Sequence, residues 1–93
     1  MMYEIKRTTK FKKDYKLAVK RGLDISKLKI VIQLLAEGKT LPEEYKDHSL
    51  SGEWIGHREC HIQPDWLLVY YYSESVLVLT LARTGTHRDL FNN

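Results

Sequence analysis

The stretch that decides the fold is residues 54–83, WIGHRECHIQPDWLLVYYYSESVLVLTLAR. It holds three runs rich in β-branched and aromatic residues, and short turn-forming segments separate these runs. The predicted elements are a strand at Trp54–Ile62, a turn at Pro64–Asp65, a strand at Trp66–Tyr72, a turn at Ser73–Ser75 and a strand at Val76–Arg83. Turns this short join antiparallel neighbours, so the stretch predicts a three-stranded meander.

The residues before the meander predict one more strand and two helices. Residues 3–8, YEIKRT, alternate with the period of two that is typical of a strand. Apolar residues at helical spacing predict a helix from Thr9, as its cap, to Arg21. A second helix is expected to start at Asp24 or Ser26. About three residues join the two helices, which favours an antiparallel hairpin.

Two polar segments complete the predicted fold. Residues 39–52 are polar and carry Pro42 and Gly52, so we expect a loop there. The last ten residues, TGTHRDLFNN, read as a polar tail anchored by Leu90 and Phe91. The order β-α-α-β-β-β predicts a single α+β domain over residues 1–93, with a twisted, mostly antiparallel sheet. The helical hairpin is expected on one face, and the other face is left at least partly open for a ligand.

The composition excludes several classes of protein. The apolar runs, such as Val76–Leu79, are far too short to span a bilayer. No apolar stretch follows the basic start MMYEIKRTTK, so we expect no secretory signal. Cys60 is the only cysteine, which excludes an internal disulfide and suits a reducing cytosol.

The charge is distributed unevenly along the chain. Residues 1–30 hold ten lysines or arginines and three acids, a net charge of +7, while the whole chain carries only +3. The remaining residues therefore carry −4. Such asymmetry indicates a polyanionic or acidic partner, although a solvated helix face would give the same composition.

Histidines supply the candidate chemistry. Side chains alternate along a strand, so His57, Glu59 and His61 are predicted to share one polar face of the first strand of the meander. In the predicted meander Asp65 and His87 can approach the same edge of the sheet. Imidazole takes up and releases protons near neutral pH, as cleavage of RNA through the ribose 2′-OH requires. The competing interpretation, a metal site, is disfavoured because strand histidines four residues apart lie roughly 13 Å apart at about 3.3 Å per residue.

Three strings in order carry a family resemblance. They are KDHSLSGEW at 46–54, GHRECHIQPDWLLVYY at 56–71 and RTGTHRDLF at 83–91. Together they closely resemble the YafQ branch of the RelE/ParE toxin superfamily. The resemblance implies a microbial-ribonuclease-like fold, cleavage of messenger RNA on the ribosome, and a cognate antitoxin. It implies no cofactor and no membrane association, and DNA binding only as the toxin–antitoxin complex.

The resemblance also implies roles for individual residues. The catalytic group is His48, His61, Asp65 and His87, and the substrate- or phosphate-binding group is Arg83, Phe91 and Glu59. Glu59 stands where relatives often have aspartate. His57 stands where an aromatic residue such as tyrosine is expected, so it receives no catalytic role.

The resulting hypothesis is a metal-independent, cytoplasmic endoribonuclease, with His48 favoured as base and His87 as acid. His61 and Asp65 would orient this pair and hold the phosphate, and Arg83 would stabilise developing negative charge. One alternative is a non-catalytic inhibitor of DNA gyrase like the ParE toxins, which would not need these histidines. The other is a basic RNA-binding module, which would bind RNA and leave it intact.

Overall fold

A five-stranded mixed sheet forms the centre of the computed structural model, which describes residues 2–73 and 75–92. The strand order is β1-β5-β4-β3-β2. The strands are β1 (Glu4–Arg7), β2 (His48–Ser49), β3 (Arg58–Gln63), β4 (Trp66–Ser73) and β5 (Val78–Gly85). Strand β1 is parallel to β5, and the other neighbours are antiparallel. The predicted meander and the α+β class are therefore confirmed.

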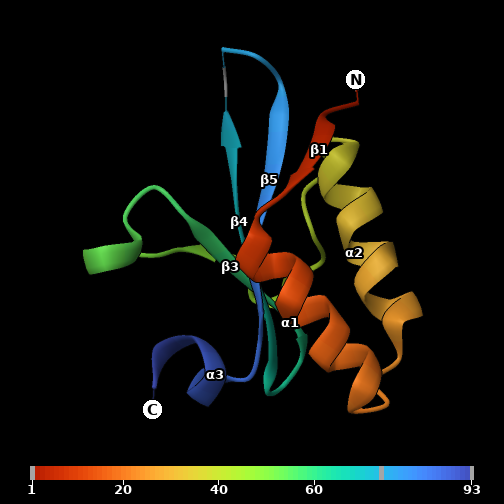
Figure 1. The fold of residues 1–93 in the computed structure, drawn as a ribbon. Coiled ribbons are helices and arrows are strands. Elements are labelled where there is room, and N and C mark those ends of the chain that lie inside the picture. Colours follow the sequence, from red (N-terminus) through yellow and green to blue (C-terminus); the bar gives the residue numbers. More distant parts are fainter. Residues whose placement is uncertain (1, 74, 93) are drawn as a thin grey trace.

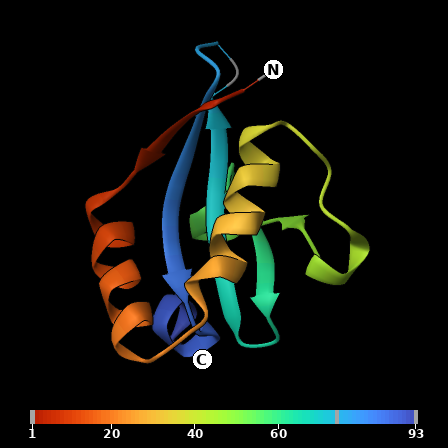
Figure 2. The ribbon, with the colours of Figure 1, turned by 90° about the vertical axis from the view of Figure 1, so that its right-hand side faces the viewer.

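Two helices, α1 (Thr9–Lys20) and α2 (Ile25–Ala36), cover one face of this sheet as an antiparallel hairpin (Figure 1). Figure 2 views the molecule from the side of the helices, with the strands behind them. The side chain of Thr8, not Thr9, caps α1 by accepting a hydrogen bond from the Phe11 N–H at 2.9 Å. Asp24 caps α2, which is one of the two starts expected from the sequence.

The sheet separates two apolar clusters of very different size. The main core lies between the sheet and the helices and contains Phe11, Leu28, Cys60 and Leu81, among others. A second, smaller cluster lies on the opposite face and consists of Leu67, Val69, Ala82 and Leu90. Alternation along each strand produces this division. Because the second cluster is small, the rest of that face is available for polar side chains.

The first strand of the meander is shorter than predicted. It begins at Arg58, not at Trp54, because Gly52–Trp54 forms a 3₁₀ turn and Gly56 adopts a left-handed φ of 87°. His57 consequently lies outside the strand, and the expected row of three polar residues is reduced to Glu59 and His61. The last strand starts at Val78, two residues later than predicted, and the Glu74 part of the predicted turn lies outside the described residues.

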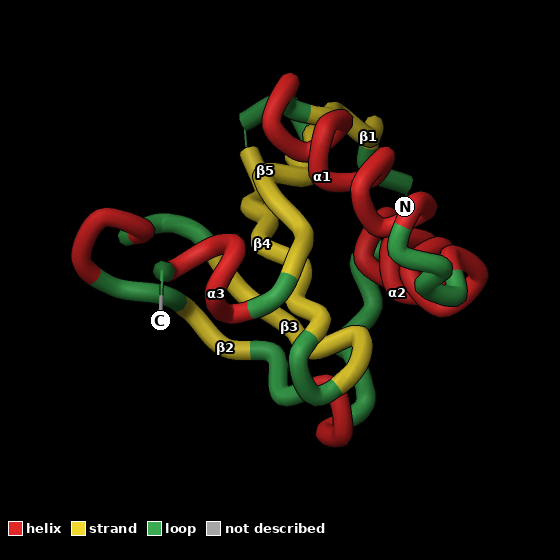
Figure 3. The backbone as a smooth tube through the Cα atoms, turned by 60° about the horizontal axis from the view of Figure 1, so that its bottom comes forward, coloured by secondary structure: helices red, strands yellow, loops and turns green. Residues whose placement is uncertain are grey.

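Two elements that matter for the site were expected to be irregular. The segment 39–52 contains a 3₁₀ turn at Glu43–Tyr45 and the two-residue strand β2, which pairs beside β3 (Figure 3). The tail contains the helix α3 (His87–Phe91), which starts with a reciprocal capping box between Thr86 and Asp89. Strand β2 is too short for any periodic pattern, whereas the T-H-R-D spacing did carry a signal for α3. In the described ranges no helix is long and apolar enough to cross a membrane.

Candidate active site

His48 reaches the site from the edge strand β2, where it pairs with Glu59 on β3. Its Nδ1 lies 2.8 Å from the carbonyl oxygen of Lys46. A carbonyl oxygen only accepts, so Nδ1 must carry the proton and donate it. In the neutral ring Nε2 then holds the free lone pair. In that neutral form Nε2 is the atom that can accept a proton from a substrate, and when His48 is protonated the same atom faces the Glu59 carboxylate at 3.5 Å.

The residue before His48 fixes this segment to the sheet. The carboxylate of Asp47 accepts hydrogen bonds from the Tyr70 hydroxyl at 2.7 Å and from the Arg58 Nε at 3.2 Å. Burial and the hydrogen bond to Asp47 raise the pKa of the Tyr70 phenol well above its ordinary value. The phenol therefore stays protonated and donates this bond. Asp47 belongs to the string KDHSLSGEW that carries the family resemblance, but the resemblance implied no role for it. Its contacts identify it as the anchor of the His48 segment.

Glu59 and His61 share one face of β3, two residues apart. The Glu59 Oε1 lies 3.5 Å from the His48 Nε2 and 3.4 Å from the His61 Nε2. Glu59 is only 5% exposed, and a buried carboxylate needs nearby positive charge or donors. A carboxylate also repels phosphate, so these contacts favour Glu59 as the partner of two histidines over the phosphate-binding role implied by the resemblance.

His87 is the first residue of α3 and is tied to the turn before β4. One oxygen of Asp65, Oδ1, accepts hydrogen bonds from the His87 backbone N–H at 2.9 Å and from its ring Nδ1 at 2.7 Å. These two bonds, the backbone one first, hold the pKa of Asp65 below its ordinary value. Asp65 is therefore an anion at neutral pH, and the ring presents Nε2 away from it.

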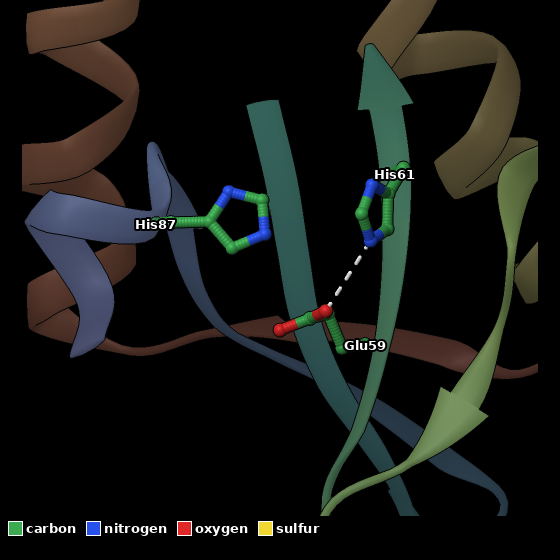
Figure 4. Close-up of side chains that lie close together, drawn as sticks. All are labelled: Glu59, His61 and His87. Atoms are coloured by element: carbon green, nitrogen blue, oxygen red, sulfur yellow. Dashed lines mark ion pairs between the residues drawn. The ribbon is translucent and has the colours of Figure 1, made fainter. Parts of the chain in front are cut away.

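The fold gathers the predicted catalytic group on the sheet face opposite the helical hairpin. Ring centroids are 6.5 Å apart for His48 and His61, and 5.6 Å apart for His61 and His87. In the close-up, Glu59, His61 and His87 point toward one another from β3 and α3 (Figure 4). His61 thus lies between the two histidines that were expected to transfer protons.

The same trio could hold a metal ion. Ligand atoms of Glu59, His61 and His87 all lie within 4.8 Å of one another, and imidazole with carboxylate is a common ligand set for zinc or copper. The sequence argument against a metal compared His57 with His61, whereas the structure brings His87 to His61 instead. A bound ion would occupy the lone pairs that proton transfer needs.

Arg83, on β5, points to the face of the sheet that α1 covers, away from the histidines. Its Nε and Nη2 donate to the two carboxylate oxygens of Asp14, each at 2.9 Å. Asp14 also accepts from the Thr84 N–H at 3.1 Å. The guanidinium therefore ties β5 to α1, and a contact with phosphate would require it to share or leave Asp14. Nothing in the sequence pattern marked Asp14.

Phe91 and His57 take part in aromatic packing around Trp54. The Phe91 ring stands edge-on to Trp54 with centroids 5.9 Å apart, which anchors the end of α3. The His57 ring contacts Trp54 and Tyr71 at centroid distances of 5.3 and 4.9 Å. His57 thus occupies an aromatic position, consistent with the tyrosine expected there.

Comparison with known proteins identifies the family of proteins to which the chain belongs. A family model described as a bacterial toxin of type II toxin–antitoxin systems, YafQ, matches residues 3–92. The mRNA interferase toxin YafQ of Escherichia coli K12 is 44% identical over 89 residues, which cover 95% of each chain. The chain belongs to the YafQ family of toxins, as the three sequence strings led us to expect.

Solved structures agree with this assignment. The YafQ chain in a crystal structure of the E. coli DinJ–YafQ toxin–antitoxin complex has a TM-score of 0.89 and 42% identity, and the match covers 98% of this chain and 99% of that one. A metal-bound toxin from Helicobacter pylori has a TM-score of 0.91 and 43% identity, covering 97% and 100% of the two chains. The fold is therefore that of the family over nearly its full length.

Proposed function

We propose that the protein is an endoribonuclease that cuts messenger RNA by acid–base catalysis between histidines. The observation that carries the proposal is the placement of His48 and His87 on either side of His61, each with its Nδ1 fixed by an acceptor. The E. coli relatives are named mRNA interferases, which supports this class of activity.

The two outer histidines have different surroundings, which suits different roles. His48 in its neutral tautomer takes the proton of the ribose 2′-OH through Nε2, and the 2′-oxygen attacks the phosphorus. The bond from phosphorus to the 5′-oxygen then breaks, and that oxygen takes a proton from His87. The Asp65 anion stabilises the cationic ring of His87 before this transfer. The products are a 2′,3′-cyclic phosphate and a free 5′-hydroxyl.

His61 is placed to hold the phosphate between these two groups. A cationic ring at this point would stabilise the negative charge of the phosphorane, and the nearly buried Glu59 lies 3.4 Å from the His61 Nε2. Arg83 remains a candidate for the same task, although its bidentate contact with Asp14 makes it less available than His61.

The partners follow from the family and are proposed for this chain. An E. coli YafQ forms a complex with the antitoxin DinJ, so we expect a cognate antitoxin that neutralises this toxin. We place its activity in the cytoplasm, on messenger RNA bound to ribosomes. DNA binding is expected only for the toxin–antitoxin complex.

Induction of the protein in bacterial cells, followed by mapping of RNA 5′ ends, tests the proposed function. New ends bearing 5′-hydroxyls should appear inside coding regions within minutes of induction. Damage to DNA without new RNA ends would favour a gyrase inhibitor, and RNA association without cutting would favour a binding module. Either result would overturn the proposed activity.

The basic helix α1 gives a prediction about ribosome binding. Lys12 and Lys16 line a groove between α1 and α2 together with Arg7 and Lys29, and none of the described residues that line it is acidic. Charge reversal of Lys12, Lys13 and Lys16 to glutamate should weaken binding to ribosomes at least tenfold at low salt and flatten its dependence on salt, because fewer counterions are released (about 0.7 to 0.9 per contact).

Filter binding of the triple variant to purified ribosomes at several salt concentrations measures this effect. Lys39→Glu, which changes an exposed lysine outside the basic segment, serves as control. Equal affinity of the triple variant and the wild type at every salt concentration would show that the basic face of α1 is only exposed to solvent and binds no ribosome.

A further inference from the structure

The helix that carries His87 is short and depends on contacts with distant parts of the chain. Helix α3 has five residues, too few to be stable alone. Leu90 buries its side chain in the smaller apolar cluster, and Phe91 packs on Trp54. These apolar contacts hold the last turn of α3. The first turn, where His87 lies, is held by polar contacts.

Arg21 supplies a contact to this first turn from the end of α1. Its Nη1 lies 2.7 Å from Asp89 Oδ2, and its Nη2 lies 3.4 Å from Asp89 Oδ1, across 68 residues of sequence. The bond from Arg21 is the largest cause that lowers the pKa of Asp89 to about 2. The ion pair is therefore present throughout the pH range in which the toxin would act.

Asp89 connects this ion pair to the start of α3. Its Oδ2 also accepts the Thr86 N–H at 3.0 Å, and its own N–H donates to the Thr86 hydroxyl at 3.0 Å. The same carboxylate lies so close to Gly85 that a Cβ there would come within 3.0 Å of it. The Arg21 guanidinium and the Thr86 N–H thus fix one carboxylate, two residues from His87.

We propose that Arg21 is a positioning residue, which holds Asp89 and thereby orients the His87 ring toward His61 and Glu59. The inference rests on the proposed role of His87. Arg21 follows the last residue of α1 and lines, with Asp65 and Asp89, a cavity that borders the site. Its guanidinium acts through α3 and touches no reacting group.

Arg21→Gln tests this inference. Single-turnover cleavage of a defined mRNA on purified ribosomes should show a saturating rate about tenfold lower, because small displacements of a reacting group reduce rates steeply. The toxin concentration at half-saturation should change less than twofold. Amide hydrogen exchange of Leu90, whose N–H donates to the Thr86 carbonyl, should become faster as α3 loosens.

Two further variants separate positioning from other effects. Asp89→Asn keeps an acceptor for the Thr86 N–H and removes the charge, so it should match Arg21→Gln, and the double variant should show no further loss. Lys39→Gln removes another exposed ion pair and one positive charge far from α3, and it should cleave at the wild-type rate. An ion pair this exposed contributes little to stability, so all variants should fold.

The measured outcomes distinguish a positioning role of Arg21 from a role in RNA or ribosome binding. A higher half-saturation concentration with an unchanged saturating rate would place Arg21 in RNA or ribosome binding and overturn the inference. So would multiplicative losses in the double variant, or unchanged cleavage by Arg21→Gln. Wild-type cleavage by a folded His87→Ala protein would instead remove His87 from the proposed mechanism, and the positioning role of Arg21 with it.

Discussion

His87→Ala should lower the rate of RNA cleavage by about 10² to 10⁴-fold, the typical cost of losing one acid–base group, and should abolish toxicity. The protein should remain folded, because the His87 side chain is 43% exposed and belongs to neither apolar cluster. The substitution leaves the backbone N–H of residue 87 in place to bind Asp65. The loss would therefore be one of proton transfer and not of structure.

Cleavage rates and survival after induction measure the effect, and circular dichroism with thermal unfolding checks the fold. His57→Tyr is the matched control, because tyrosine can keep the ring contacts with Trp54 and Tyr71. It should cleave at nearly the wild-type rate. Normal activity of a folded His87→Ala protein would remove His87 from the mechanism.

A substrate with 2′-deoxyribose at the scissile nucleotide should bind normally and resist cutting, with a rate below about one hundredth of that of RNA. The proposed nucleophile is the 2′-oxygen, and His48 has no proton to take when that oxygen is absent. Single-turnover cleavage of the two substrates on purified ribosomes, with analysis of product ends, provides the measurement. A deoxy substitution one nucleotide away is the control and should be cut at the normal rate.

Product chemistry distinguishes this mechanism from one that uses a metal-activated water. RNA cleavage should give 2′,3′-cyclic phosphate or 3′-phosphate ends together with 5′-hydroxyls, and chelators should not stop it on free RNA. Metal ions that bind Glu59, His61 and His87 should inhibit, because they occupy the same lone pairs. Cutting of the deoxy substrate, or 5′-phosphate products, would mean that water is the nucleophile and would remove the roles of His48 and His87.

Much of the fold could be predicted because its signals are local. The runs of β-branched and aromatic residues in β4 and β5, the helical stripes of α1 and α2, and the turn at Pro64–Asp65 each depend on a few neighbouring residues. Two predicted element boundaries were wrong because a single residue departed from the pattern around it. Gly56 broke the expected strand before His57, and Thr8 replaced Thr9 as the cap.

The candidate site depended more on the family resemblance than on periodicity. His48 was assigned through the string KDH, since no pattern marked the two-residue strand β2. Alternation did place Glu59 and His61 on one face, and the capping-box spacing at Thr86 could have indicated α3. Asp14 and Arg21 could not have been found, since their partners lie 69 and 68 residues away.

The sequence by itself determined the α+β class, the order of the main elements, the family, and the set of residues able to move protons. Only the tertiary structure decided that His87 meets His61, that Glu59 is buried beside two histidines, and that Asp14 binds Arg83 on the helix side of the sheet. The physical reason is the difference in the length of chain over which these effects act. Propensity and periodicity act over a few residues, whereas distances between remote side chains depend on strand order, register and the packing of α1 and α3 against the sheet.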